Sequence, residues 1–180
     1  MRHLPIALIA LALAAVAGEH PAAPASPAAR GEIALATPGE PGEPFVLEGR
    51  LVSLPDSLPL RDAVVYLYHA DAHGKYSEKG AAAPRLAGTV RTNVVGGFRV
   101  RTVFPGLYDG TPHLHYEVRG PRAWRKGTIS LCRRHGAGSD SAFARVPWMV
   151  TVPSPDGWAY VERDGDGHLR ASWTLGLRAK

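Results

Sequence analysis

Two histidines, His113 and His115, are separated by one residue in the stretch "HLHYEV". In a β-strand, residues two apart project from the same face, so both imidazoles would point the same way. Imidazole is a common metal ligand, and two on one face would form half of a preformed metal site. The alternative interpretation is an ordinary pair of histidines on a solvated strand face, and the spacing alone does not decide between the two.

Two tyrosines near these histidines favour the metal interpretation. Tyr76 lies in "HADAHGKYS" and Tyr108 in "FPGLYDG", each just after a glycine-bearing turn. Loops held by rigid strands often aim side chains into a site. Because the ordinary pKa of a phenol is about 10, ionising tyrosine near neutral pH requires a strongly Lewis-acidic partner. Ferric iron is such a partner, and tyrosine ligates haem iron in catalase.

The elements that would position these residues are predicted to be strands. The 180-residue chain is 45% hydrophobic and contains 20 glycines and 16 prolines, which favours short strands and turns. Runs such as "AVVYLYHA" are rich in strand formers, and no sustained helical periodicity occurs beyond the N-terminus. We therefore predict an all-β fold, a β-sandwich of short antiparallel strands. "VVGG", between "RLAGTVRTN" and "GFRVRTV", predicts a β-hairpin, and "DGDG" from Asp164 to Gly167 predicts another turn.

The N-terminal region has a different composition. Residues 1–17 resemble a secretory signal peptide, with Arg2, an apolar stretch and small residues at the Ala17 end. Residues 18–44 are rich in proline, alanine and glycine and are predicted to be a linker. The sandwich domain is then expected over residues 45–180. These features predict an exported protein, periplasmic or extracellular, that is not membrane-bound after cleavage; an uncleaved N-terminal anchor is the alternative.

Charge and cysteine content exclude other classes. The net charge is +5, and much of the surplus falls between Arg119 and Arg134, but no nucleic-acid-binding motif accompanies it. We therefore expect no nucleic-acid partner. Cys132 is the only cysteine, so an intramolecular disulfide is impossible and stability must come from apolar burial, to which a bound metal could add. His69 and His73 around Asp71 are interpreted as turn residues rather than a second metal site.

Three stretches carry a resemblance to a known family. "VVYLYHADAHGKYS", "GFRVRTVFPGLY" and "PHLHYEV" resemble, in order, motifs of the intradiol ring-cleavage dioxygenases of the catechol and protocatechuate type. The clear match runs from about residue 42 to residue 118. The resemblance implies one non-haem ferric ion held by Tyr76, Tyr108, His113 and His115. It also implies a small aromatic diol and dioxygen as partners, with the ring opened between its two hydroxyl-bearing carbons. Tyr108 has the position of the tyrosine that leaves the iron and acts as a base.

The chain departs from this family at three positions. Gly110 or Thr111 stands where the family commonly has arginine, Ser130 stands near its usual glutamine, and Tyr68 replaces its usual tryptophan. The alternative is therefore a non-catalytic exported β-sandwich module that binds a metal, a carbohydrate or a protein. A transthyretin-like carrier would explain a sandwich but not the paired histidines. The sequence leaves the aromatic substrate and the oligomeric state open.

Overall fold

A computed structural model describes residues 29–77, 83–108, 110–120, 124–134, 146, 148–149 and 157–178. Every regular element in these ranges is a strand. The strands are β1 (Ala29–Arg30), β2 (Glu32–Ala34), β3 (Pro44–Leu54), β4 (Val64–His69), β5 (Leu86–Arg91), β6 (Gly97–Val103), β7 (His113–Arg119), β8 (Trp124–Arg134), β9 (Trp148–Met149), β10 (Trp158–Arg163) and β11 (Leu169–Arg178). The described residues include no helix that could cross a membrane. The predicted signal peptide and residues 18–28 lie outside the described residues, so export stays a prediction.

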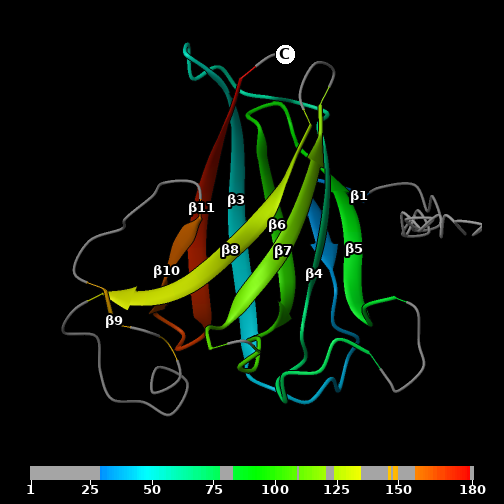
Figure 1. The fold of residues 1–180 in the computed structure, drawn as a ribbon, viewed down its shortest axis with the longest axis vertical. Helices are drawn as coiled ribbons and strands as arrows, with labels where there is room; N and C mark the ends of the chain where they lie inside the picture. Colours follow the sequence, from blue (N-terminus) through cyan, green and yellow to red (C-terminus); the bar gives the residue numbers. More distant parts are fainter. Residues whose placement is uncertain are drawn as a thin grey trace, which may run out of the picture.

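The strands form one 11-stranded sheet that folds over into two layers (Figure 1). One layer has the order β5-β4-β7-β8, and the other has the order β10-β11-β3-β6. The prediction of an all-β, sandwich-like fold is confirmed. The prediction of short antiparallel strands is correct only in part, because β11 pairs with β3 and β10 pairs with β8 in parallel. In addition, β3 and β8 are each 11 residues long.

The segment from residue 29 to residue 34 nearly closes the sheet into a barrel. β1 pairs with β5 and β2 pairs with β6, both in parallel, so this segment joins the two layers at their open edge. At its centre, the Gly31 N–H donates to the Arg91 carbonyl, and the Arg99 N–H donates to the Gly31 carbonyl. Gly31 has φ +78°, a conformation that glycine adopts without steric cost. Strands therefore extend into residues that the sequence assigned to the linker.

This closure also explains why the hairpin prediction at "VVGG" is wrong. The turn itself is present, since the Asn93 N–H donates to the Gly97 carbonyl and the Gly96 N–H to the Asn93 carbonyl. Beyond the turn, however, β5 pairs with β4 and β1, whereas β6 pairs with β3 and β2. The two strands diverge into opposite layers because the N-terminal segment lies between them. The predicted turn at Asp164–Gly167 is confirmed as the hairpin between β10 and β11.

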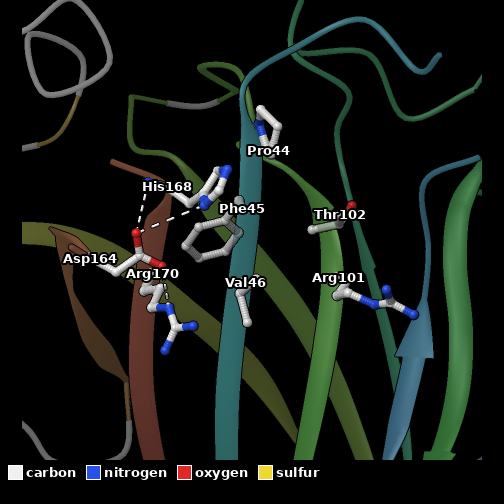
Figure 2. Close-up of a pocket in the computed structure, with 8 residues that line it drawn as sticks. All are labelled: Pro44, Phe45, Val46, Arg101, Thr102, Asp164, His168 and Arg170. Atoms are coloured by element: carbon white, nitrogen blue, oxygen red, sulfur yellow. Dashed lines mark hydrogen bonds and ion pairs between the residues drawn. The ribbon is translucent and has the colours of Figure 1, made fainter. Parts of the chain in front are cut away.

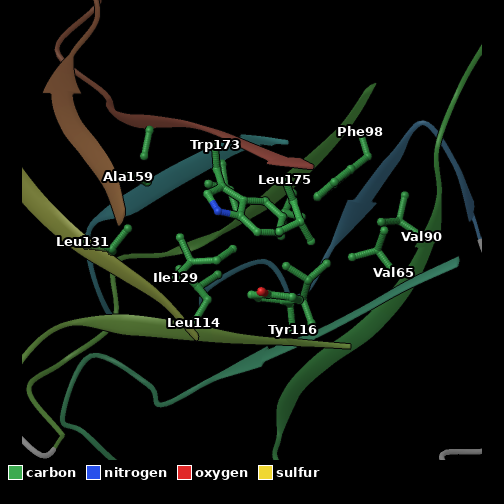
Figure 3. Packing of buried hydrophobic residues seen from close by; sticks show 14 of the residues in the cluster. Val65, Val90, Phe98, Leu114, Tyr116, Ile129, Leu131, Ala159, Trp173 and Leu175 are labelled. Atoms are coloured by element: carbon green, nitrogen blue, oxygen red, sulfur yellow. The ribbon is translucent and has the colours of Figure 1, made fainter. Parts of the chain in front are cut away.

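Alternating burial along the strands fills the space between the layers with apolar side chains. Leu114 and Tyr116 of β7 and Ile129 and Leu131 of β8 face Trp173 and Leu175 of β11 (Figure 3). The rings of Tyr116 and Trp173 lie 4.8 Å apart. Burying a large apolar side chain contributes roughly 1.5–3 kcal/mol, so this core is the main source of stability. The same alternation sends His113 and His115 to the outer face of the sheet.

Candidate metal centre

The two predicted histidine ligands project from the outer face of β7. Leu114 between them is fully buried, as a period of two requires. On the neighbouring strand β4, Tyr68 is opposite His115, and the two rings stack with centroids 4.7 Å apart and planes at 19°. On the other side, β8 places Thr128 opposite His115 and Ser130 opposite His113. The histidine pair therefore lies on a rigid, three-stranded platform.

Tyr76 reaches this platform from the loop that follows β4. Its hydroxyl lies 3.0 Å from the Nε2 atom of His113 and 2.9 Å from the Nε2 atom of His115. Two ligand atoms that bind one metal at about 2.1 Å, at right angles to each other, are about 3 Å apart. The Tyr76 oxygen thus lies at a distance from each imidazole nitrogen that two ligands of one metal would have.

The opposite ring nitrogens of the two histidines are held by the protein. The Nδ1 atom of His113 lies 2.6 Å from the Thr111 carbonyl oxygen. Because a carbonyl can only accept, His113 Nδ1 carries a proton, and its Nε2 atom faces the Tyr76 hydroxyl. The Nδ1 atom of His115 lies 3.3 Å from the Thr128 hydroxyl. Contacts of this kind fix the orientation of a metal-binding imidazole.

Burial sets the charge states of these groups in the absence of a metal. Burial, with smaller effects of Tyr68 and Tyr108, raises the pKa of Tyr76 to about 12. Burial and the neighbouring His113 lower the pKa of His115 below its ordinary value. Without a cation, Tyr76 is therefore a neutral phenol at pH 7, and His115 is a neutral imidazole. A highly charged Lewis acid would ionise Tyr76 by binding its phenolate form.

Tyr108 lies at the solvent side of this cluster. Its ring is 4.9 Å from the Tyr76 ring in an edge-to-face arrangement, and 6.2 Å from the His113 ring. The residue is 50% exposed, whereas Tyr76 is partly buried. The structure thus brings all four predicted residues together, with Tyr108 as the most accessible member.

The two loops that carry the tyrosines pack directly against each other. The Gly106 N–H of the Tyr108 loop donates to the Asp71 carbonyl of the Tyr76 loop at 2.8 Å. A Cβ atom on Gly74 would collide with the Leu107 carbonyl, and one on Gly106 would collide with the Gly74 nitrogen. Gly74 also has φ +80°. Only glycine fits at these two positions, which explains why a glycine precedes each tyrosine.

The groups noted as departures from the family pattern lie close to the site. Ser130 is on β8 directly opposite His113. Arg119, six residues beyond His113 on β7, pairs with Glu117. It lies about 20 Å along the strand from His113 and does not supply the missing arginine. Sequence reasoning missed Thr111 and Thr128 as supports of the imidazoles. Thr128 meets His115 only through the β7–β8 register, and Thr111 acts through its backbone carbonyl, which its residue type does not reveal.

Other clusters do not join this site. His69 is fully buried and its Nε2 atom lies 2.7 Å from the Thr102 hydroxyl, so it is separate from the exposed His73. A cavity of about 240 Å³ opens at the start of β3 and β11 (Figure 2). At its rim, Asp164 accepts from Arg170 and from the backbone N–H groups of its own turn. These hydrogen bonds agree with the predicted turn at Asp164–Gly167.

Fold and site together define a β-sandwich with a surface cluster of two histidines and two tyrosines. A family model described as Dioxygenase matches residues 19–133, and the chain belongs to the intradiol ring-cleavage dioxygenase family. The catechol 1,2-dioxygenase 2 of Acinetobacter lwoffii is 27% identical over 132 residues. These residues are 70% of this chain and 47% of that protein, so the chain spans about half the length of this curated relative.

Solved structures share the fold. The dioxygenase domain of a dioxygenase carbohydrate-binding protein fusion from Streptomyces sp. SirexAA-E aligns with a TM-score of 0.61 and 24% identity, covering 86% of this chain and 92% of that domain. An intradiol ring-cleavage dioxygenase from Tetranychus urticae aligns with a TM-score of 0.60 and 20% identity, covering 89% and 92%. The catechol 1,2-dioxygenase of Acinetobacter radioresistens gives a TM-score of 0.64 and 16% identity, covering 86% and 59%. At these identities the likeness concerns the fold alone.

Proposed function

We propose that this protein is a non-haem ferric-iron dioxygenase that cleaves a catechol-type ring between its two hydroxyl-bearing carbons. The observation that carries the proposal is the convergence of the Tyr76 hydroxyl with two imidazole Nε2 atoms at 2.9 and 3.0 Å, beside Tyr108. Membership of the family supports it, because this family acts on catechols with dioxygen and typically uses non-haem ferric iron.

The four side chains have different freedom, which suggests different roles. Tyr76, His113 and His115 would hold the iron as fixed ligands, because hydrogen bonds and loop packing orient each of them. Tyr108 would be the fourth ligand. When bound, ferric iron supplies a Lewis acid that binds and activates the diol. As the most exposed of the four, Tyr108 can move toward solvent, and as a phenolate it would accept a proton from an entering diol hydroxyl.

The test begins with the metal. Protein loaded with ferric iron is expected to bind one ion per chain and to be reddish, because phenolate donates charge to ferric iron. The His113→Ala/His115→Ala variant is the control that should lack both properties. Oxygen uptake is then followed with a panel of catechols. A colourless protein that takes up no iron would refute the proposal at the metal, and a coloured protein without oxygen uptake would refute the activity.

The second candidate is a non-catalytic exported module that keeps the metal-binding cluster. The observation that favours it is the pair of substitutions at the polar positions beside the site, Thr111 or Gly110 for arginine and Ser130 for glutamine. Such groups tune a metal site strongly. Retained iron and colour with no oxygen uptake on any catechol is the outcome that this candidate predicts.

A further inference from the structure

The Tyr76 loop is closed on itself by one carboxylate. The Oδ1 atom of Asp71 accepts hydrogen bonds from the backbone N–H groups of His73 at 2.9 Å and Lys75 at 3.0 Å. The Asp71 N–H in turn donates to the Lys75 carbonyl at 2.8 Å. Burial alone would raise the pKa of Asp71, but these N–H groups and the Arg85 guanidinium hold it below its usual value. The carboxylate therefore stays charged and fixes the five residues that lead to Tyr76.

Arg85 binds this loop at two points. Its backbone N–H donates to the carbonyl of Tyr76 at 2.7 Å, and its guanidinium reaches Asp71 Oδ2 at 3.3 Å. The same guanidinium makes a two-pronged contact with Glu40, at 2.5 and 2.8 Å. Planar, charge-assisted pairs of this kind are strong and directional. The Glu40 side chain is only 6% exposed, and the Asp71 side chain 14%.

Glu40 belongs to the N-terminal segment that sequence reasoning treated as a linker. This segment contacts both tyrosine loops. A Cβ atom on Gly42 would lie 2.9 Å from the Cβ atom of Ala72 in the Tyr76 loop. The Phe104 N–H, at the start of the Tyr108 loop, donates to the Glu43 carbonyl at 2.7 Å. Glu40 is therefore presented from a segment that is itself packed against the loops it holds.

We infer that Glu40, Arg85 and Asp71 form a clasp that positions the Tyr76 hydroxyl between the imidazoles of His113 and His115. The three are positioning residues, since none of them touches the donor atoms. The inference deepens the proposed function, because its consequence for iron depends on Tyr76 being a ligand. Displacing a ligand by a fraction of an ångström weakens a metal site, and losing a group that orients a ligand typically lowers metal affinity about 10- to 100-fold.

Two variants separate the charge of the clasp from its geometry. Glu40→Gln keeps the shape and removes the charge, and Arg85→Lys keeps the charge and removes the two-pronged fork. The control is Arg99→Lys, which makes the same substitution in a more exposed pair with Glu48 on the other layer of the sheet. Circular dichroism and thermal unfolding would show which variants remain folded. If Arg85→Lys does not fold, Glu40→Gln alone decides.

The first measurement uses iron-free protein. Hydrogen exchange of the backbone amides of residues 71–76 is expected to become about tenfold faster in both clasp variants and to stay unchanged in Arg99→Lys. The second uses ferric iron and a competing chelator. Affinity is expected to fall at least about tenfold in the clasp variants, with a shift in the visible absorption band that a purely structural role elsewhere would not produce.

Folded clasp variants with wild-type exchange and wild-type iron affinity would overturn the inference. Faster exchange with unchanged iron affinity and absorption would overturn it as well, because the clasp would then order the loop without positioning the ligand. Failure of the proposed function is distinguishable from both. In that case wild-type protein itself binds no iron or consumes no oxygen, and the exchange measurement still shows whether the clasp holds Tyr76.

Discussion

The Tyr76 hydroxyl lies 2.9 Å from the Nε2 atom of His115, although 39 residues separate the two in the chain. The same hydroxyl is 3.0 Å from His113 Nε2. A phenol has one proton to donate, so it cannot donate fully to both nitrogens at once. A cation at this point would satisfy all three atoms, and the predictions below follow from this relationship and from the packing that maintains it.

Iron binding is expected to release a proton from Tyr76. The pKa of this residue is raised to about 12 by burial, so the phenol is neutral before the metal binds. Affinity for ferric iron should therefore increase with pH, by about tenfold per pH unit for each phenol ionised, between pH 7 and 9. Competition with a chelator of known protonation would measure this slope. In Tyr76→Phe, iron binding should release one proton fewer, so the slope of affinity against pH should be smaller. A pH-independent affinity of the wild type would contradict the prediction.

The two tyrosines are expected to respond differently to the same substitution. Tyr76→Phe removes the oxygen shared by both imidazoles, so iron affinity should fall by at least about tenfold and the visible band should weaken. Tyr108→Phe alters the half-exposed ring and should retain more iron while reducing oxygen uptake. Iron titration and oxygen consumption on both variants check this. Equal iron affinities in the two variants would show that Tyr76 has no special position.

Stability is expected to fall in mild acid because of His69. Burial lowers the pKa of His69 to about 4, whereas an unfolded histidine has a pKa near 6.5. Above pH 6.5, His69 is unprotonated in both the folded and the unfolded protein. Between pH 6.5 and 4, only the unfolded protein binds the proton, so the free energy of unfolding falls by up to about 3 kcal/mol as the pH is lowered. Urea unfolding from pH 7 to 4.5 would measure this loss.

The matched control for this measurement is His69→Gln, which keeps a neutral polar side chain near Thr102. His115 also has a lowered pKa and contributes a slope of the same sign. The share of His69 is therefore the difference between the wild type and His69→Gln. Identical pH profiles of the two proteins would show that His69 does not titrate in this range.

The N-terminal segment is expected to be part of the folding unit. A chain that begins at residue 29 should fold like the full protein, whereas one that begins at residue 37 should lose several kcal/mol. The second deletion removes β1, β2 and the apolar contacts of Ile33 and Leu35, each of which contributes roughly 1.5–3 kcal/mol if fully buried. It also exposes the edges of β5 and β6. Equal urea midpoints for the two deletions would support the linker interpretation instead.

A single substitution tests the same closure more gently. Gly31→Ala places a side chain at φ +78°, where an L-residue is strained, and should cost about 1 kcal/mol. Its nearest neighbour, the Asn93 Cβ atom, would be 3.9 Å away, so strain and not a clash is the cause. The control is Gly165→Ala, at a turn glycine whose φ is not positive and where an added Cβ meets nothing within 4 Å. Thermal unfolding that lowered both variants equally would contradict the role of Gly31.

The sequence by itself determined the features that depend on short-range order. The one-residue spacing of His113 and His115 placed both on one strand face, since side chains alternate along any strand. The glycines before Tyr76 and Tyr108 marked two turns, and "DGDG" marked a third. The family motifs brought these residues into one hypothesis, and the fold places the four side chains together.

Only the tertiary structure decided which distant segments meet. Nothing local in the Pro-rich stretch around Glu40 indicates that its carboxylate binds Arg85, and nothing in "VVGG" shows that β5 and β6 diverge around Gly31. The parallel pairing of β11 with β3 is likewise invisible in either strand. The physical reason is that backbone preferences and hydrophobic alternation act over a few residues. Strand pairing and ion pairs across the fold depend instead on the whole chain burying its apolar faces at once.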